Sequence, residues 1–421
     1  MSAILVLCPS HRDHRELPLL YPEREHRFFF HDYATEELER MVSPSPAPCG
    51  VRHPDDEIEA IVAAYGGARI DAVISTDDYP GSALASIVAG RMGLPGAEPR
   101  ANLLCQHKYY SRLAQRAACA LAVPDFEVLT NGRLYDVGFP CFIKPVKSFF
   151  SIGACQVDNA RSLEELARRA TLPEAFFSPF KALFEKYTQL PFGAHRVLAE
   201  DFLEGEQVTL EGYAFAGSIH TIGIVDSVMF PGTLAFNRFE YPSRLPDTVQ
   251  SRMAEVATPV MKQIGFDHGL FNIEFMYNSQ RDTIHIIEIN PRMVSQFADL
   301  HEKVDGFNTY AVLVDLALGR APQTKHRAGK YAVAASCVFR RFRDALVVKA
   351  PTANDVAQLH ASIPDIRVEV LVNERSQLSH EMQDGSSYRY GMVNIGGRDI
   401  PGVLQIFEYC KRALPFVFAD T

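Results

Sequence analysis

Two glutamates in the middle of the chain stand where a divalent cation could bind. Residues 270 to 292 read LFNIEFMYNSQRDTIHIIEINPR, two runs of β-forming residues around a polar turn, and this pattern predicts a β-hairpin. If the chain reverses at residues 280 to 281, Glu274 lies opposite Glu288, and Asn290 faces the same way two residues further on. Carboxylates that face each other on neighbouring strands lie within about 5 Å and repel one another. The pair therefore predicts a bound cation.

Magnesium is the cation that this set of ligands favours, with Mn²⁺ as the alternative ion. Two carboxylates and an amide oxygen are hard ligands, and Mg²⁺ completes its octahedron with water and substrate phosphates. The same register places Met276, Ile284 and Ile286 on the face of the two glutamates, so this face is not simply a solvated one. A surface hairpin with two unrelated acids is the alternative interpretation.

A lysine inside an apolar strand is the second candidate. Lys144 lies in FPCFIKPV, and because a buried ammonium without a partner is costly, we expect an anion beside it. A structural ion pair is the alternative interpretation of this lysine. The loop KSFFSIG that follows holds residue types that contact phosphate groups: Lys147, Ser148, Ser151 and Gly153.

A run of acids is the third candidate. The segment VLAEDFLEGEQVTLEG carries acids on both sides of the apolar step Phe202–Leu203, namely Glu200, Asp201, Glu204 and Glu206. Solvated acids at the end of a strand are the common interpretation of such a run. The alternative is a nucleotide hinge, in which backbone groups of the apolar step read an adenine edge and an acid binds ribose hydroxyls.

The first hundred residues must position part of any such site. They alternate apolar strands with helical patterns, which predicts a parallel α/β layer with strands at residues 4 to 8 and 70 to 75. The first strand is followed by PSHRDH in place of G-x-G-x-x-G, which disfavours an NAD-dependent dehydrogenase. Asp77, Asp78 and Tyr79 follow the second strand at its C-terminal end, a usual ligand position where acids could meet an amine. Capping of the next helix by Asp77 or Ser82 is the alternative.

The rest of the chain mixes helices with antiparallel strands. Lys108 opens a helix that ends near Pro124, and strands follow. Residues 171 to 194 are rich in aromatic residues, and we interpret them as helical pieces of a mobile subdomain. Residues 195 to 229 read as antiparallel strands, and the C-terminal ninety residues as strands before a final helix.

Composition narrows the class of protein. The 421 residues hold 42 Lys+Arg and 51 Asp+Glu, a net charge of -9, without the basic clusters that a nucleic-acid binder needs. No apolar stretch of about 18 residues predicts a membrane span, and the N-terminus lacks a cationic leader. Eight scattered cysteines favour free thiols in a reducing cytoplasm, and zinc binding by Cys8, His11 and His14 is disfavoured because a fourth ligand is missing.

The order of these motifs resembles that of the ATP-grasp superfamily over about residues 70 to 325. The matching segments are QHKYYSRL, FIKPVKSFFSIGA, AEDFLEGE, FNIEF and EINPR. The resemblance implies that Lys108, Lys144 and Ser151 bind ATP phosphates, that the hinge from Glu200 through Asp201 to Leu203 binds adenine, and that Glu206 binds ribose. It further implies magnesium ligands and catalytic residues, which are Glu274, Glu288 and Asn290 for the metal and Asn290 and Arg292 for catalysis.

The resemblance also implies an α/β architecture of four parts. These are an N-terminal Rossmann-like layer (residues 1–105), a small α+β lid (106–198), an antiparallel ATP-binding core (199–325) and a short α+β C-terminal lobe (326–421). Roughly residues 125 to 198 are expected to close over the site, with the aromatic-rich segment as part of the cap.

The implied activity is that of an ADP-forming carboxylate-amine ligase, similar to L-amino-acid ligases and biotin carboxylases, that makes an amide or peptide bond through an acyl phosphate. The loop KSFFSIGA is poorer in glycine than that of biotin carboxylases, which favours amino-acid-like substrates over bicarbonate. A biotin-carboxylase-type carboxylase and a non-catalytic ATP-binding regulator are the alternatives. Asp78, Arg238 and Arg389 are candidate substrate residues, since an arginine can clamp a carboxylate through two hydrogen bonds. The expected partners are a small carboxylic acid and an amine, in the cytoplasm, and a homodimer is the one assembly considered.

Overall fold

The computed structural model describes residues 1–22, 25–42, 50–67, 69–130, 132–148, 152–167, 172–192, 197–380 and 387–420. Its N-terminal part is a layer built on a parallel sheet of order β2-β1-β3, which confirms the α/β pattern read from the sequence. The strands are β1 (Ser2–Leu7), β2 (His26–His31) and β3 (Ala72–Ile74). The helices of this layer are α1 (His11–Leu20), α2 (Thr35–Val42), α3 (Pro54–Tyr65), α4 (Gly81–Arg91) and α5 (Pro99–Gln106).

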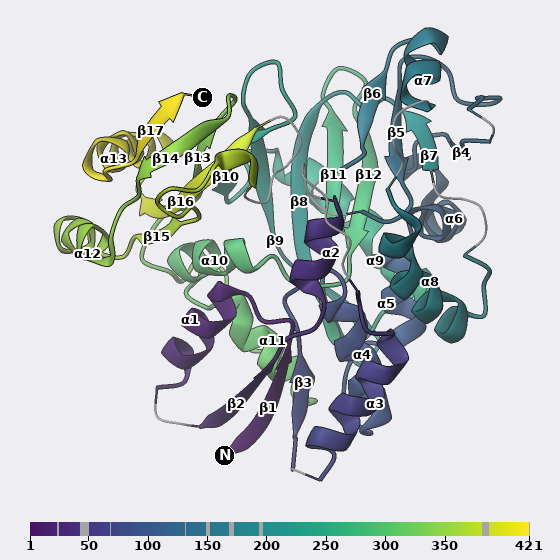
Figure 1. Cartoon of the computed structure of the whole chain (residues 1–421), viewed down its shortest axis with the longest axis horizontal. Helices are drawn as coiled ribbons and strands as arrows, with labels where there is room; N and C mark the ends of the chain where they lie inside the picture. Colours follow the sequence, from purple (N-terminus) through teal and green to yellow (C-terminus); the bar gives the residue numbers. More distant parts are fainter. Residues whose placement is uncertain are drawn as a thin grey trace.

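A sheet of order β12-β11-β8-β9-β10-β13-β16-β15 forms the centre of the molecule (Figure 1). Its strands are β8 (Glu206–Phe215), β9 (Ser218–Met229), β10 (Phe236–Tyr241), β11 (Gly269–Asn278), β12 (Thr283–Asn290), β13 (Val333–Arg341), β15 (Arg367–Val370) and β16 (Tyr388–Gly397). The expected boundary at residues 325 and 326 lies before β13. One sheet therefore continues from the expected core into the expected C-terminal lobe.

Apolar side chains alternate along the central strands and bury both faces of the sheet. Helix α9 (Asp247–Ile264) packs Met253 and Met261 into the cluster that holds Ile273 and Phe275 of β11. On the other face, α10 (Ala298–Asp305) packs against β10 and β13, and α11 (Thr309–Ala317) against β11. The C-terminal lobe adds α12 (Ala353–Ser362), α13 (Ile400–Ala413) and the pair β14 (Ala345–Lys349) and β17 (Val417–Asp420).

A smaller antiparallel sheet of order β4-β7-β5-β6 stands beside the central sheet, within the residues that are expected to form the lid (Figure 1). It contains β4 (Phe126–Val128), β5 (Cys141–Pro145), β6 (Cys155–Val157) and β7 (Val197–Asp201), and α7 (Ala160–Ala167) covers it. Helix α6 (Lys108–Cys119), followed by the short turn η1 (Ala120–Ala122), precedes the lid and packs against α9.

The aromatic-rich segment packs against the N-terminal layer, whereas the sequence interpretation grouped it with the closing cap. It folds as α8 (Glu174–Thr188) and packs against α5, α3 and α2 of the N-terminal layer. Phe176, Phe180 and Phe184 are at most 1% exposed in this contact. Burial of large aromatic side chains is strongly favourable, so we expect α8 to stay with the N-terminal layer.

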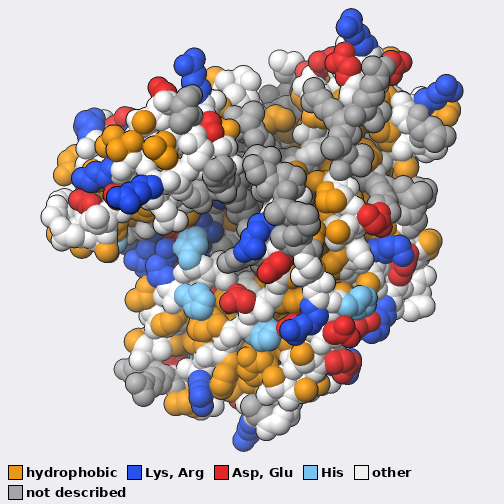
Figure 2. All heavy atoms as spheres, viewed as in Figure 1, with side chains coloured by type: hydrophobic (Ala, Val, Ile, Leu, Met, Phe, Trp, Pro, Cys, Tyr) orange, Lys and Arg blue, Asp and Glu red, His pale blue; other side chains and the backbone are white. Residues whose placement is uncertain are grey.

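Charge is distributed over the visible surface without a basic stripe. Figure 2 shows Lys and Arg side chains interspersed with Asp and Glu on the face presented. Within the described residues, no helix combines the length and the apolar character that crossing a bilayer requires.

Candidate active site

The hairpin of β11 and β12 pairs Glu274 with Glu288 and Asn272 with Asn290, which confirms the register predicted from the sequence. The register shifts directly after this pair, because Phe275 faces Ile286 and Ile287 is an extra residue on β12. A single inserted residue reverses the faces that follow it. Ile284 and Ile286 therefore pair with core residues of the opposite face, and the expectation that they share the face of Glu274 is wrong.

The bulge at Ile287 gives two cations a backbone acceptor beside Glu288. The Ile287 carbonyl accepts hydrogen bonds from Arg112 Nη2 at 2.8 Å and from Lys144 Nζ at 3.3 Å. A bulged residue leaves the ladder of hydrogen bonds, so its carbonyl can take such donors. The bulge thus ties the lid strand β5 and helix α6 to the strand that carries Glu288.

The two opposed carboxyl groups differ in the direction of their pKa shifts because their neighbours differ. Lys108 Nζ lies 3.2 Å from Glu288 Oε2, whereas Glu274 Oε2 accepts a hydrogen bond from the Gln207 amide at 2.9 Å. Burial and the neighbouring Glu288 raise the pKa of Glu274. Burial also opposes ionisation of Glu288, but Lys108 and Lys144 outweigh it and lower the pKa of that carboxyl. Of the two carboxyl groups, Glu288 is therefore the one that its neighbouring lysines favour in the ionised form.

The donor set fits magnesium better than a metal that needs a closed protein cage. Asn290 donates its amide hydrogen to Asn272 Oδ1 at 3.0 Å, which directs the amide oxygen away from that partner. Two carboxylates and this oxygen leave positions for water and phosphate oxygens, as Mg²⁺ prefers. In the part of the chain that the structure describes, no group of three or more His, Cys, Asp or Glu side chains could hold a metal.

Lys144 has the anionic partner that its burial requires. Its Nζ lies 2.7 Å from Glu200 Oε2, and Arg112 holds the same carboxylate through Nε at 2.7 Å and Nη2 at 2.9 Å. Burial raises the pKa of Glu200, but Arg112 and Lys144 together lower it to about 2. Burial lowers the pKa of Lys144 to about 8, against the pull of Glu200. The structural ion pair considered for Lys144 is therefore present.

Arg112 is a residue of this site that the sequence reasoning missed. Its side chain is 2% exposed and also bonds Gln115 at 2.6 Å. The sequence did contain a signal for Arg112: it lies four residues after Lys108, which places both side chains on one face of α6. A small pocket runs along that face, between α6, Lys144 and the β12 residues from Ile287 to Ile289.

Arg292 follows β12 and points toward the N-terminal layer. Its Nε lies 3.8 Å from Asp78 Oδ1, while Lys147 Nζ lies 2.9 Å from Asp78 Oδ2. The neighbouring Asp77 instead caps α4 by accepting the Gly81 amide at 2.7 Å, which is the capping role considered as its alternative. Only Asp78 of this acidic pair therefore reaches the site.

A domain model supplies the deciding comparison. The ATP-grasp domain model matches residues 137–300, the span that holds Lys144, Glu200, the glutamate hairpin and Arg292. The chain carries an ATP-grasp domain.

Solved structures extend the ATP-grasp fold over the chain. The L-amino acid ligase from Bacillus licheniformis superposes with a TM-score of 0.70 at 14% identity, covering 100% of this chain and 99% of that one. Biotin carboxylase from Campylobacter jejuni gives 0.67 at 14% identity, covering 99% and 92%. N5-carboxyaminoimidazole ribonucleotide synthetase from Thermotoga maritima gives 0.66 at 13% identity, covering 99% of each chain. These similarities confirm the predicted ATP-grasp fold.

Curated relatives match this chain over a smaller share of their own length than the solved structures do. The uncharacterized protein y4rH of Sinorhizobium fredii is 24% identical over 263 residues, 60% of this chain and 50% of that protein. The N-terminal section of the carbamoyl phosphate synthase large chain of Aquifex aeolicus is 26% identical over 220 residues, 51% of this chain and 36% of that protein. The chain thus spans half or less of the length of these relatives.

Within the ATP-grasp domain, the expected hinge separates inward and outward acids. Glu200 turns inward to its cations, whereas Asp201 and Glu206 are exposed and Leu203 is half-buried. The Asp201 amide donates to the Asp125 carbonyl at 3.0 Å, which fixes the end of β7. The nucleotide roles of these residues stay predictions, and Ser151 lies outside the described residues.

The two remaining substrate candidates lie apart from the ATP-grasp residues described above. Residues paired across neighbouring strands share a face of the sheet, and the pairs Phe239–Ser227, Ser227–Gln207 and Gln207–Met276 lead across it from β10 to β11. Met276 is two residues from Glu274, so Phe239 shares the face of Glu274. Arg238 is adjacent to Phe239, so it lies on the opposite face, where it donates to Glu240 at 2.5 Å. A substrate role for Arg238 stays a prediction, and in this structure its side chain pairs with Glu240 on the face opposite Glu274. Arg389 lies on β16, with β8, β9, β10 and β13 between it and β11, and donates to Met392 Sδ at 4.0 Å.

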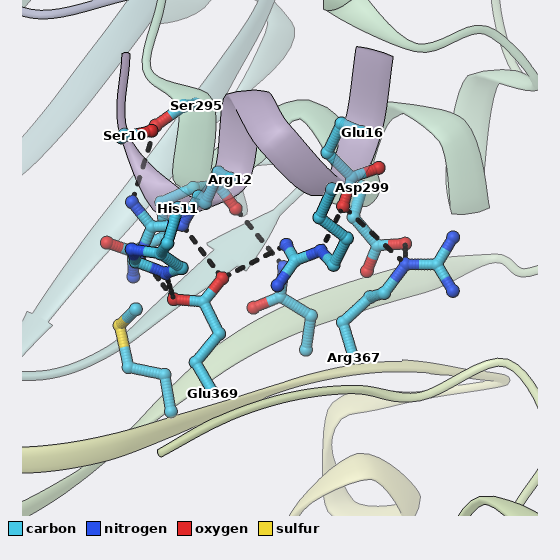
Figure 3. A network of polar contacts seen from close by, with 12 residues as sticks. Ser10, His11, Arg12, Glu16, Ser295, Asp299, Arg367 and Glu369 are labelled. Carbon is cyan, nitrogen blue, oxygen red and sulfur yellow. Dashed lines mark hydrogen bonds and ion pairs between the residues drawn. The ribbon is translucent and has the colours of Figure 1, made fainter. Parts of the chain in front are cut away.

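The loop after β12 is fixed from three sides of the ATP-grasp fold. The Arg292 carbonyl accepts from Asn272 Nδ2 at 3.0 Å, and Glu211 accepts the Val294 amide at 2.9 Å. Ser295 accepts from Arg12 Nη1 at 3.3 Å, and Figure 3 shows Arg12 between Ser295 and Glu369 of β15. The loop that carries Arg292 is therefore held by the central sheet and by Arg12 of the N-terminal layer, which Glu369 of β15 holds in turn.

Proposed function

We propose that the chain is an ADP-forming carboxylate-amine ligase that joins amino-acid-like substrates through an acyl phosphate. The observation that carries the proposal is the opposed pair Glu274 and Glu288, with Lys108 beside it, inside an ATP-grasp domain. Phosphoryl transfer needs mainly positioning and neutralisation of charge, and this cluster supplies both. The activity belongs to the cytoplasm on this proposal, since it consumes ATP.

The residues of the site divide the work of the first step. Lys108 and Lys144 neutralise the phosphates of ATP, and the hinge from Glu200 to Glu206 holds the nucleoside. Glu274, Glu288 and Asn290 would hold magnesium, and the chemistry that the ion would supply is positive charge at the phosphate oxygens. Arg292 orients the substrate carboxylate, one oxygen of which attacks the γ-phosphorus as the bond to ADP breaks.

The second step forms the new bond. The amine nitrogen attacks the carbonyl carbon of the acyl phosphate, phosphate leaves with the former carboxylate oxygen, and the nitrogen releases its proton to solvent or phosphate. The lid sheet with α7 keeps water from the acyl phosphate. Because α8 is packed into the N-terminal layer, the closing unit is the sheet β4-β7-β5-β6 rather than the full span of residues 125 to 198.

The turn between β1 and α1 supports a substrate without a phosphate group. A helix N-terminus commonly binds phosphate through its free amides. Here Asp13 Oδ2 accepts the Ser10 amide at 2.6 Å and the Ser10 hydroxyl at 2.9 Å, so a side chain of the protein already fills this end. The full-length likeness to an L-amino acid ligase adds support for amino-acid substrates.

The test is a matrix of amino acids and other small carboxylic acids paired with amines, with ATP and Mg²⁺. We expect release of ADP together with a condensed product of the corresponding mass, and neither from the Glu288→Gln variant. Absence of both signals over the matrix, with folded protein that binds ATP, would contradict the proposal and favour a regulator. ADP release that requires bicarbonate and biotin would replace it by a carboxylase.

A further inference from the structure

Lys147 is a buried cation that the proposed phosphate contacts do not use. It follows β5 by two residues, and its side chain is 3% exposed. Its Nζ lies 5.1 Å from the ring centroid of Tyr79 and 5.7 Å from that of Phe180 on α8. Burial lowers the pKa of Lys147, and Asp78 acts to raise it. The lysine is therefore inserted into the N-terminal layer and fixed there by one carboxylate and two rings.

Asp78 divides its two oxygens unequally between two cations. Oδ2 is 2.9 Å from Lys147 Nζ, whereas Oδ1 is 3.8 Å from Arg292 Nε. An unrestrained arginine and carboxylate form two parallel hydrogen bonds of about 2.7–2.9 Å. Arg292 instead makes one long contact with Asp78, and its Nη1 donates to the Met293 carbonyl at 3.2 Å. The side chain of Arg292 is 23% exposed, so its guanidinium can still donate hydrogen bonds to another carboxylate.

We propose that Lys147 and Asp78 are positioning residues that aim Arg292 at the carboxylate of the substrate. Asp78 sets the direction of the guanidinium, and Lys147 prevents Asp78 from capturing it. The inference rests on the proposed ligase function. It assigns Asp78 an indirect role, in place of the direct contact with an amine that its position after β3 suggested.

Four variants test this division of roles. Lys147→Met leaves Asp78 free to bind Arg292 fully, so KM for the carboxylic acid rises about tenfold or more, whereas KM for ATP stays within about twofold. Asp78→Asn raises the KM of the acid by a smaller factor. The double variant recovers to the level of Asp78→Asn alone, because the competing carboxylate is gone. Lys147→Arg keeps the wild-type KM within about threefold.

The matched control is Lys186→Met, which removes an exposed lysine of α8 paired with Asp55 at 2.7 Å. It leaves both KM values unchanged. A KM for the acid in the double variant as high as that of Lys147→Met alone would overturn the proposal, because Asp78 would then not be the group that binds Arg292 once Lys147 is gone. A parallel rise in the KM of ATP would also overturn it, because Lys147 would then bind phosphate.

A second readout separates this inference from failure of the ligase function. Phenylglyoxal modifies accessible arginines, and peptide mass spectrometry measures the rate at Arg292 without any substrate. Lys147→Met slows the modification about threefold or more by pairing Arg292 with Asp78, and the added Asp78→Asn change restores the rate. Equal rates in the wild type, Lys147→Met, Asp78→Asn and the double variant would refute the competition between Lys147 and Arg292 for Asp78, whatever the reaction is.

Discussion

Replacement of Glu200 by glutamine is the sharpest test of how the lid and the core are held together. The substitution keeps the shape of the side chain but removes the carboxylate that pairs directly with both Arg112 and Lys144, which are 2% and 7% exposed. Removing one member of a buried ion pair costs about 3–5 kcal/mol. The pKa of Glu200 gives a similar figure, because a fall from 4.5 to about 2 corresponds to about 3 kcal/mol at about 1.4 kcal/mol per unit.

The assay is urea unfolding of the wild type and Glu200→Gln, with thermal unfolding as a second measure. For a cooperative unit of this length, about 3 kcal/mol corresponds to about 3 °C in Tm. The folded pKa lies below the unfolded one, so the stabilisation is complete above pH 4.5 and is lost as the pH falls toward 2. The difference between the two proteins should therefore shrink on acidification.

The control is Asp282→Asn, which breaks an exposed pair with Arg252 at 2.7 Å. Exposed pairs contribute about 0–1 kcal/mol, so this variant should unfold close to the wild type. If Glu200→Gln matches the control at pH 7, or keeps its deficit unchanged at low pH, the reasoning about the buried cluster is refuted.

Three further predictions follow from packing, charge and register. His301→Gln should destabilise the protein near neutral pH, and progressively less as the pH rises through 9. Burial lowers the pKa of His301, but Asp305 and Glu211 outweigh it and raise the pKa from 6.5 to about 9. Urea unfolding from pH 6 to 10 measures the loss of stability, and a loss that grows with pH would contradict the prediction. Phe184→Ala in α8 should lower the free energy of unfolding by about 3–5 kcal/mol, whereas Leu121→Ala at a 92% exposed position should leave it almost unchanged. An equally small effect at Phe184 would support the interpretation of α8 as part of a mobile cap. Arg238→Ala should keep kcat/KM within about twofold of the wild type, and a larger loss would place Arg238 at the site.

The glutamate hairpin was predictable because its determinants are local. A polar turn between two β-forming runs sets the pairing, and a side-chain period of two then places Glu274 opposite Glu288. The bulge at Ile287 was not predictable in the same way. Isoleucine is an ordinary strand residue, and the donors to the Ile287 carbonyl, Arg112 and Lys144, come from distant parts of the sequence.

The segment around α8 shows a second limit of sequence reasoning. Its phenylalanines indicate a buried face, but they do not say which partner buries it. The chain leaves the small sheet after α7, forms α8 and returns to the sheet at β7, so the position of α8 in the sequence favoured the lid. The contacts of α8 are instead with the N-terminal layer. Likewise, the inward turn of Glu200 depends on Arg112, which lies 88 positions away in the sequence.

The most direct test of the central claim is calorimetric binding of ADP with and without Mg²⁺. Glu274 and Glu288 are proposed to hold the metal, whereas the nucleoside is held elsewhere. We predict that Mg²⁺ tightens ADP binding by the wild type about tenfold or more, and that Glu274→Gln with Glu288→Gln still binds ADP but loses this dependence. An unchanged magnesium dependence in the double variant would contradict the assignment of the hairpin as the metal site.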